Sequence, residues 1–365
     1  MILYKLNSFN EISWWEINQV DCKVHYSWGN RLPMQQSANI EEETYDTPEK
    51  AAFGMRSKIN NMKDRKGYTE EIPSHPPSLP MLCQEYKKPP NWESIALQPK
   101  LDGIRCIVSA EGIYTRTNKR ITSCPHIEYY CDLLPEGIKL DGELYIDNIP
   151  MNMIESYVLK HTPSESTMQL KLHMFDCIDL EAPFFARMEE VCRINDLLEQ
   201  KYYNGRIKNI QHPAFTKHFP FSIVKTIIHD SIAPGKVDEI VQPFFQQCLA
   251  EGYEGAIIRN ANAAYEPNRR SAQILKLKEF FDDEFKIVDV VEGKGKTAIL
   301  VCQTHKSQQE FKCNFKATDE RKRQMLLFKA NYINKWLRIE HEGMYDNGKP
   351  RCPVGIHIFD KQNHD

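Results

Sequence analysis

The sequence predicts a mixed α+β protein in three parts: a small strand-and-helix module over residues 1–75, an antiparallel α+β domain over 76–280, and a β-barrel over 281–365. Three observations predict this organisation. The 365 residues exceed what one ordinary core accommodates. The prolines of "EIPSHPPSLP", at 73, 76, 77 and 80, prevent regular structure there and indicate a linker. From 281 onward, short strand patterns follow one another closely.

Composition excludes several classes of protein. A hydrophobic share of 41% and a charged share of 27% are typical of soluble globular chains. No apolar run approaches the ~20 residues that span a bilayer, so no membrane partner is expected. The N-terminus does not read as a signal peptide, and the eleven cysteines include no Cys-x-x-Cys pair. These features favour free thiols in an intracellular, cytoplasmic setting, in a bacterial or virus-infected cell, with the nucleus left open as an alternative.

In the first module, "ILYKL" and "KVHYSWG" alternate as strands do. Thr47 followed by Pro48 predicts a helix start, and Gly67 is a plausible stop. One helical face carries Ala52, Met55, Ile59 and Met62.

The middle domain reads as strands and two long helices. "GIRCIVSAEGIYTRTNKRIT" predicts two strands joined at Glu111-Gly112, and "LDGELYI", "LKLHMFDCIDL", "EGAIIR" and "AQILKLKEF" predict further strands. Residues 184–203 form a helix with an apolar inward face. Its outward face is expected to carry Arg187, Glu190 and Arg193. A second helix covers 237–250, unless Pro243 delays its start.

After 281 the predicted strands are "EFKIVDVVEG", "AILVCQ", "EFKCNFK", "WLRIEHEG" and "GIHIF", with a helical stretch "DERKRQMLLFKANY" between the third and fourth. Five short strands in so few residues predict a small barrel, of which the OB-fold is the commonest type.

Lys100, in "QPKLDGIRC", is the residue that most needs an explanation. It ends a predicted strand that points it inward, and a buried lysine is costly unless it is paired or used. Beside an acid and a glycine turn, its amine suits a covalent nucleophile.

Lys276 and Lys278, in "LKLK", fall on one face of a strand because side chains alternate with period two. Two such lysines repel each other unless an anion lies between them, and a phosphate chain is the natural anion. The alternative is an edge strand with exposed lysines. Glu143 and Glu254 each sit beside a glycine turn at a strand end, where they suit Mg²⁺ or a ribose, although each alone also suits a turn acid.

The combination is more specific than its parts. "QPKLDGIRCI" resembles the active-site signature of the ATP-dependent DNA ligases. "LDGELY", "MFDCIDL", "EGYEGAIIR" and "ILKLKE" resemble the later nucleotidyltransferase motifs, in the family's order. The resemblance covers about 80–280 strongly and 281–365 loosely, as the family's OB domain. Residues 1–70, with "YSWGN", are similar to the WGR module of DNA-end-binding proteins, although Asn30 replaces its arginine.

The resemblance implies a function for each motif. Lys100 would take AMP from ATP, pass it to the 5′-phosphate of nicked duplex DNA, and so allow the 3′-hydroxyl to close the strand. Glu254 would face the metal, expected to be Mg²⁺. The nucleotide would contact Gln98, Arg105, Arg116, Glu143, Phe175, Lys276 and Lys278, with Phe175 stacking on adenine and Gln98 at its edge. Lys63, Arg65 and Lys66 would contact DNA phosphates. The chain is expected to act as a monomer.

Two departures from the family pattern stand out. Asn118 replaces a glycine in a turn, where asparagine tolerates a left-handed backbone. Ile358 replaces the arginine of the C-terminal Arg-x-Asp-Lys motif, so Lys349 or Arg351 is a candidate stand-in. With no large N-terminal DNA-binding domain ahead of the core, the pattern resembles the compact ligases of viruses and some bacteria.

Two alternatives remain at this point. One is an RNA ligase or an mRNA capping guanylyltransferase of the same superfamily. The other is a non-catalytic DNA-end-binding scaffold. NAD⁺-dependent ligation is disfavoured because that family's cysteine zinc site has no counterpart here.

Overall fold

The computed structural model divides into two compact units, residues 1–277 and 278–365. It describes residues 1–6, 12–30, 39–66, 68–72, 79–160, 162–208, 218–305, 307–345 and 347–361. The predicted proline linker falls largely on 73–78, and the predicted helix stop on Gly67, both outside the described residues.

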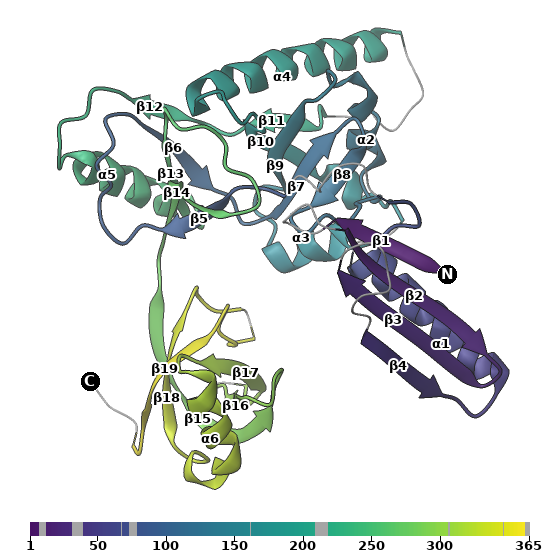
Figure 1. Ribbon diagram of the computed structural model, residues 1–365. Helices are drawn as coiled ribbons and strands as arrows, with labels where there is room; N and C mark the ends of the chain where they lie inside the picture. The colour runs from purple at the N-terminus through teal and green to yellow at the C-terminus, as the bar shows by residue number, and fades with distance from the viewer. Residues whose placement is uncertain are drawn as a thin grey trace. The chain divides into compact units, whose positions relative to one another are not determined.

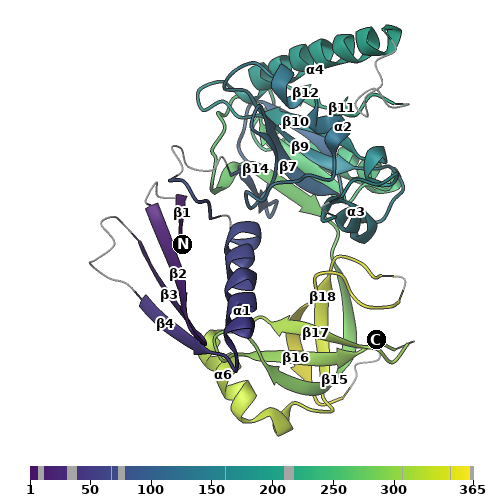
Figure 2. The same ribbon diagram turned by 90° about the vertical axis from the view of Figure 1, so that its right-hand side faces the viewer.

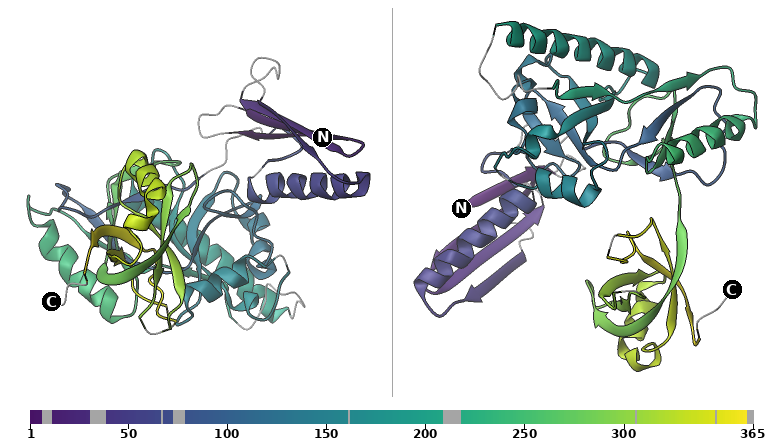
Figure 3. Two further views of the ribbon diagram at one scale, coloured as in Figure 1. Left: turned by 90° about the horizontal axis from the view of Figure 1, so that it is seen from below. Right: turned by 180° about the vertical axis from the view of Figure 1, so that it is seen from behind.

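The first unit begins with a four-stranded antiparallel sheet covered on one face by a helix (Figure 3). Helix α1 (Pro48–Asn60) starts as predicted, with Thr47 Oγ1 accepting the Lys50 backbone N–H at 3.3 Å. Ala51, rather than Ala52, is its fully buried residue, against Trp15 and Ile17. A single π-helical turn follows the helix. The strands are β1 (Ile2–Leu6), β2 (Ile12–Val20), β3 (Lys23–Asn30) and β4 (Asn39–Thr44), and the turn is η1 (Asn61–Arg65).

Two five-stranded sheets form the rest of this unit. In order, the first contains β11 (Phe221–Ile223), β10 (Lys171–Cys177), β9 (Lys139–Tyr145), β7 (Ile104–Ser109) and β8 (Gly112–Thr115). The second contains β12 (Ile227–His229), β6 (Ile95–Lys100), β13 (Gly255–Asn260), β14 (Arg270–Lys278) and β5 (Leu82–Glu85). The pairings β10–β11 and β14–β5 are parallel, whereas β6, β7, β9 and β13 pair antiparallel, as the sequence predicted for the core.

Each of these sheets is covered by a long helix (Figure 1). Helix α4 (Phe184–Ile207) packs its apolar stripe, including Val191, Ile194 and Leu198, into the core of the first sheet. Helix α5 (Val237–Ala250) packs on the second, with Val241 and Phe245 buried beside Ile258. It begins at Val237 and contains Pro243, so the proline does not delay its start. Two short helices, α2 (Pro125–Glu128) and α3 (Met151–Val158), complete the unit.

The second unit is a closed barrel of five strands (Figure 2). Its order is β15 (Phe281–Glu292), β16 (Ala298–Gln303), β17 (Glu310–Phe315), β19 (Val354–Phe359) and β18 (Trp336–His341), and β18 closes onto β15. Helix α6 (Asp319–Leu327) contributes Met325 to the barrel core. These strands and this helix correspond to the six segments expected from the sequence.

Candidate active site

The ladder between β6 and β13 brings Lys100 and Glu254 together. Lys100 pairs with Gly255 in the antiparallel register, and the Glu254 backbone N–H donates to the Lys100 carbonyl at 3.1 Å. The Lys100 amine forms an ion pair with the Glu254 carboxylate. Their side chains are only 22% and 12% exposed, so the predicted nucleophile is a partly buried lysine held by an acid. The two residues lie together at one end of β6, although they are 154 residues apart in the sequence.

Glu143 reaches the same region from β9, where it pairs across the ladder with Arg105 on β7. Loss of hydration raises the pKa of the Glu143 carboxyl to about 8, although the charges of Lys100 and Arg105 oppose that rise. Gly103, in the turn after Lys100, lets β9 come this close: a Cβ at Gly103 would lie 2.5 Å from the Leu144 carbonyl oxygen and 2.9 Å from Glu143 Cγ. Glu143 is therefore a carboxyl that is costly to ionise, with two cations close enough to reduce that cost.

Arg105 is anchored by Asp141, which sequence analysis did not single out. The guanidinium donates through Nε and Nη2 to the two carboxylate oxygens, at 2.9 and 2.6 Å. The Tyr265 hydroxyl donates to the same carboxylate at 2.5 Å, and Asp141 is fully buried. The Arg105 guanidinium lies 5.3 Å from the centre of the Phe175 ring. Arg105, held by Asp141, therefore lies close to the Phe175 ring.

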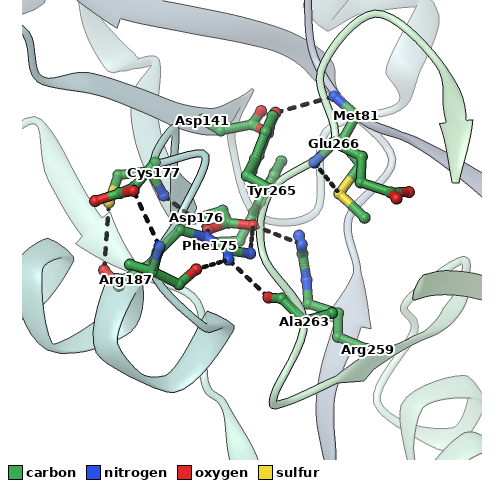
Figure 4. A network of polar contacts seen from close by, with 12 residues as sticks. Met81, Asp141, Phe175, Asp176, Cys177, Arg187, Arg259, Ala263, Tyr265 and Glu266 are labelled. Carbon is green, nitrogen blue, oxygen red and sulfur yellow. Dashed lines mark hydrogen bonds and ion pairs between the residues drawn. The ribbon is translucent and has the colours of Figure 1, made fainter.

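A second buried carboxylate, Asp176, holds two further arginines close to Phe175 (Figure 4). Arg187 binds it through Nε at 2.7 Å and Nη2 at 3.1 Å, and Arg259 binds it through Nη1 at 2.7 Å. Arg259 also donates through Nε to the Gln98 side-chain oxygen at 2.9 Å. Its guanidinium lies 5.6 Å from the centre of the Phe175 ring. Phe175 thus lies near two arginines whose positions are set by separate aspartates.

The expectation that Arg187 faces outward is wrong, because only 2% of its side chain is exposed. Position 187 follows Phe184 by three residues and precedes Val191 by four, which places it on the buried stripe of α4. Asp141, Asp176, Arg187, Arg259 and Tyr265 are the residues that sequence reasoning missed. An available signal was an acid within an apolar strand, as in "KLDGELY" and "KLHMFDC", because such an acid requires a buried partner.

The remaining predicted nucleotide contacts lie at strand ends. Lys276 and Lys278 lie at the C-terminal end of β14, and both are partly buried. The Lys278 amine lies 2.8 Å from the Glu342 carboxylate, within the second unit. That contact follows from the β15–β18 register, which pairs Phe281 with His341 and so carries Glu342 alongside the residues after Lys278. Arg116 directly follows β8 and is exposed. Asn118, in the same turn, has the left-handed φ of 61° that its replacement of glycine predicted.

The predicted DNA contacts lie at the turn η1. Lys63 forms an ion pair with Glu70, and Lys66, just after the turn, is exposed. The Arg65 side chain lies outside the described residues. Within the described part of the chain, no helix is both long and apolar enough to cross a bilayer. All eleven cysteines are free thiols, seven of them buried.

Magnesium fits the carboxylates at this site. The described residues contain no group of three side chains that would hold a metal by themselves. Mg²⁺, however, is commonly held by one or two carboxylates together with substrate phosphates rather than by a cage of side chains. Glu254 beside Lys100 is one such carboxylate, and Glu143 becomes a second only when it is ionised.

Comparisons with known proteins identify relatives of the part of the chain that carries this site. Residues 80–278 match the family model "ATP dependent DNA ligase domain". The DNA ligase of African swine fever virus (strain Badajoz 1971 Vero-adapted) is 31% identical over 226 residues, covering 57% of this chain and 48% of the viral protein. The chain therefore spans about half the length of that relative. The DNA ligase of Haemophilus influenzae is 26% identical over 275 residues, covering 74% of this chain and 88% of that enzyme.

A solved Lig E DNA ligase shares the fold. It superposes with a TM-score of 0.60 at 21% identity, and the match covers 77% of this chain and 99% of that one. At this identity the likeness concerns the fold, over about three quarters of the chain.

Proposed function

Since the chain belongs to the family of ATP-dependent DNA ligases, we propose that it seals nicks in duplex DNA with ATP as AMP donor, acting as a monomer. The observation that carries this proposal is the position of Lys100. Its amine lies at the end of β6, beside Glu254 and near the Glu143 carboxyl, where three of the family's motifs converge.

The chemistry proceeds in three transfers. The Lys100 amine loses its proton and attacks the α-phosphorus of ATP, forming an N–P bond while pyrophosphate leaves. The 5′-phosphate at the nick then displaces lysine and takes up AMP. The 3′-hydroxyl finally attacks that activated phosphate, loses its proton and releases AMP. Because the attack needs the free amine, the ion pair between Lys100 and Glu254 must be broken before the first attack.

The other site residues position the nucleotide and the nick and neutralise the charge of the phosphates. Phe175 provides the stacking surface for adenine, and Gln98 lies at the edge of the base. Glu143 serves the ribose side, while Arg105, Arg116, Lys276 and Lys278 face the phosphates and the nick. Glu254, and Glu143 when ionised, would hold Mg²⁺, which would neutralise charge on the phosphates.

We assign residues 76–280 as the adenylation domain and 281–365 as an OB-fold. The OB assignment rests on a closed five-stranded barrel in which the last two strands exchange order, β17-β19-β18. We assign residues 1–75 as a WGR-like module that adds DNA affinity through Lys63, Arg65 and Lys66. Its support is a four-stranded sheet with one covering helix and the "YSWGN" strand.

The test is transfer of label from α-labelled ATP to the full chain with Mg²⁺, read on a denaturing gel. Wild type should become labelled, and Lys100→Ala and Lys100→Arg should not, because arginine keeps its proton. Lys160→Ala, an exposed lysine outside the site, is the matched control. Label retained by Lys100→Ala would overturn the assignment. Transfer from GTP instead of ATP would indicate a capping-type enzyme, and tight DNA binding without any labelling would indicate a scaffold.

A further inference from the structure

The Tyr265 hydroxyl makes two hydrogen bonds whose directions its partners dictate (Figure 4). The Met81 backbone N–H can only donate, and it donates to the hydroxyl oxygen at 3.0 Å. The single hydroxyl proton is therefore directed to the Asp141 carboxylate, at 2.5 Å. Tyr265 is 2% exposed, and burial together with the charge of Asp141 raises the pKa of its hydroxyl well above the ordinary value, so the oxygen keeps that proton.

Asp141 passes this constraint on to Arg105. Its Oδ2 atom accepts both the Tyr265 hydroxyl and Arg105 Nη2, at 2.5 and 2.6 Å, while Oδ1 accepts Arg105 Nε at 2.9 Å. A planar guanidinium bound through two nitrogens to one carboxylate takes its direction from that carboxylate. The hydroxyl therefore fixes the oxygen on which the direction of Arg105 depends.

Arg105 has hydrogen-bond donors that the protein does not use. Two of its five N–H bonds go to Asp141, and the other three have no acceptor among the residues that the structure describes. Only 16% of its side chain is exposed, so the hydration of this cation is restricted. A partly buried guanidinium with unused donors suits an anionic group such as a phosphate. The direction of Arg105 thus decides where such a group is held.

We propose that Tyr265 is a positioning residue for adenylation, which acts on Arg105 through Asp141 and does not itself touch the nucleotide. The inference rests on the proposed function, because it takes AMP transfer to Lys100 as the reaction that Arg105 serves. Met81 directly precedes β5, whereas Arg105 and Asp141 lie on β7 and β9. Tyr265 therefore ties an arginine of the first sheet to the chain that enters the second.

The hydroxyl can be removed without removing what holds the ring. The Arg187 guanidinium lies 5.5 Å from the centre of the Tyr265 ring, a contact that phenylalanine keeps. The loop after β13 and the segment before β5 are also joined by other bonds. The Leu79 N–H donates to Asn268 Oδ1 at 2.9 Å, and the Asn268 N–H donates to the Leu79 carbonyl at 3.1 Å. Tyr265→Phe is therefore expected to fold.

The experiment measures the single-turnover rate of Lys100 labelling from α-labelled ATP with Mg²⁺ in the full chain. Tyr265→Phe should slow it by about tenfold or more, the value of one hydrogen bond to a charged group. Tyr86→Phe is the matched control, because the Tyr86 hydroxyl donates at 2.9 Å to Asp238, a carboxylate that Arg105 does not bind. It should stay within about twofold of wild type.

A second background separates positioning from a structural role. Arg105→Lys removes the paired bonds to Asp141, so the hydroxyl has no guanidinium left to direct. Arg105→Lys should itself slow labelling, and adding Tyr265→Phe should slow it by less than about threefold more. A structural contribution would cost the same factor in both backgrounds, because it does not depend on Arg105.

The inference would be overturned, with the proposed function left standing, by an unchanged rate in Tyr265→Phe, by an equal factor in both backgrounds, or by wild-type labelling in Arg105→Lys. Where Arg105→Lys takes no label at all, the difference between Tyr265→Phe and Tyr86→Phe decides. Loss of cooperative urea unfolding in Tyr265→Phe would also overturn the inference, because the hydroxyl would then serve the fold. If wild type takes no label, the proposed function and the inference both fail.

Discussion

In the N-terminal module and in the two sheets that follow it, cations pair with acids. The pairs of the module are exposed to solvent, whereas those around Phe175 are buried. In the module, Lys50 and Asp46 form an ion pair with side chains 62% and 81% exposed. Around Phe175, Arg187 and Arg259 share Asp176 with side chains at most 4% exposed. The atoms are alike and the distances similar, at 2.6 to 2.7 Å.

The contrast teaches that burial, rather than the presence of a pair, decides what a pair does. An exposed pair gains little because water and salt screen it. A buried pair is costly to assemble, and removing one member leaves an uncompensated charge. A buried pair therefore fixes geometry, which is what a site for nucleotide chemistry requires, whereas the module's pairs are easily exchanged for other partners.

Removing one carboxylate from each of the two regions tests this contrast most strongly. Asp176→Ala should lower the free energy of unfolding by about 3–5 kcal/mol, because two buried arginines lose their acid. Asp46→Ala, the matched exposed change, should lower it by less than about 1 kcal/mol. Urea unfolding followed by circular dichroism measures both. Similar losses for the two variants would contradict the contrast.

Lys278 tests whether a largely buried cation also contributes to the rate of adenylation. Lys278→Ala should slow adenylation by about 10²- to 10³-fold, as expected for a charge that stabilises the transition state. Glu342→Gln removes the partner of Lys278 but keeps the lysine, so it should slow the reaction far less. Single-turnover labelling gives these rates. An unchanged rate with weaker DNA binding would place Lys278 on the DNA backbone instead.

The pH dependence of stability at Glu143 gives a further test of the buried region. The folded chain holds the Glu143 proton up to about pH 8, whereas the unfolded chain releases it near its ordinary value, so stability falls as pH rises between the two. Glu143→Gln cannot ionise and should therefore gain stability relative to wild type as pH rises from about 5 to 8. Urea unfolding at pH 5.5 and pH 8.5 measures the gain. A gain that is independent of pH would show that Glu143 does not hold its proton.

The smallest effect is expected in the module. Deleting residues 1–75 should leave Lys100 labelling measurable and weaken binding to nicked DNA, with the difference shrinking as salt rises. Lys63→Ala should account for only part of that loss, because Lys63 is already paired with Glu70. Lys50→Ala is the control on the same module. Unchanged affinity for nicked DNA at low salt after the deletion would rule out a DNA-binding module.

The order of elements was predictable wherever apolar residues alternate or recur on one stripe. The five barrel strands and helix α4 are examples. Strand β4, "NIEEET", was not foreseen, since it is largely exposed and carries no apolar alternation. Its pairing with β3, rather than its own residues, makes it a strand.

The site was predictable in part. Motif order placed Lys100, Glu143 and Glu254 as candidates, and the structure brings them together, although their roles remain predictions. The aspartates Asp141 and Asp176 could not be interpreted because their partners arrive from distant segments: Tyr265 lies 124 residues from Asp141, and Arg259 lies 83 residues from Asp176. Local patterns carry no information about such pairings.

The ladder between β6 and β13 has a consequence for how the protein is made. Strand β6 emerges early in synthesis, but β13, which begins just after Glu254 and pairs along the whole of β6, follows about 155 residues later. Until then β6 lacks this neighbour, and a contact of such sequence separation forms slowly. A ribosome that stalls between these strands would hold a nascent chain that carries Lys100 without Glu254 and a β6 edge without its β13 partner. The translation rate through this interval is therefore expected to affect the yield of active protein.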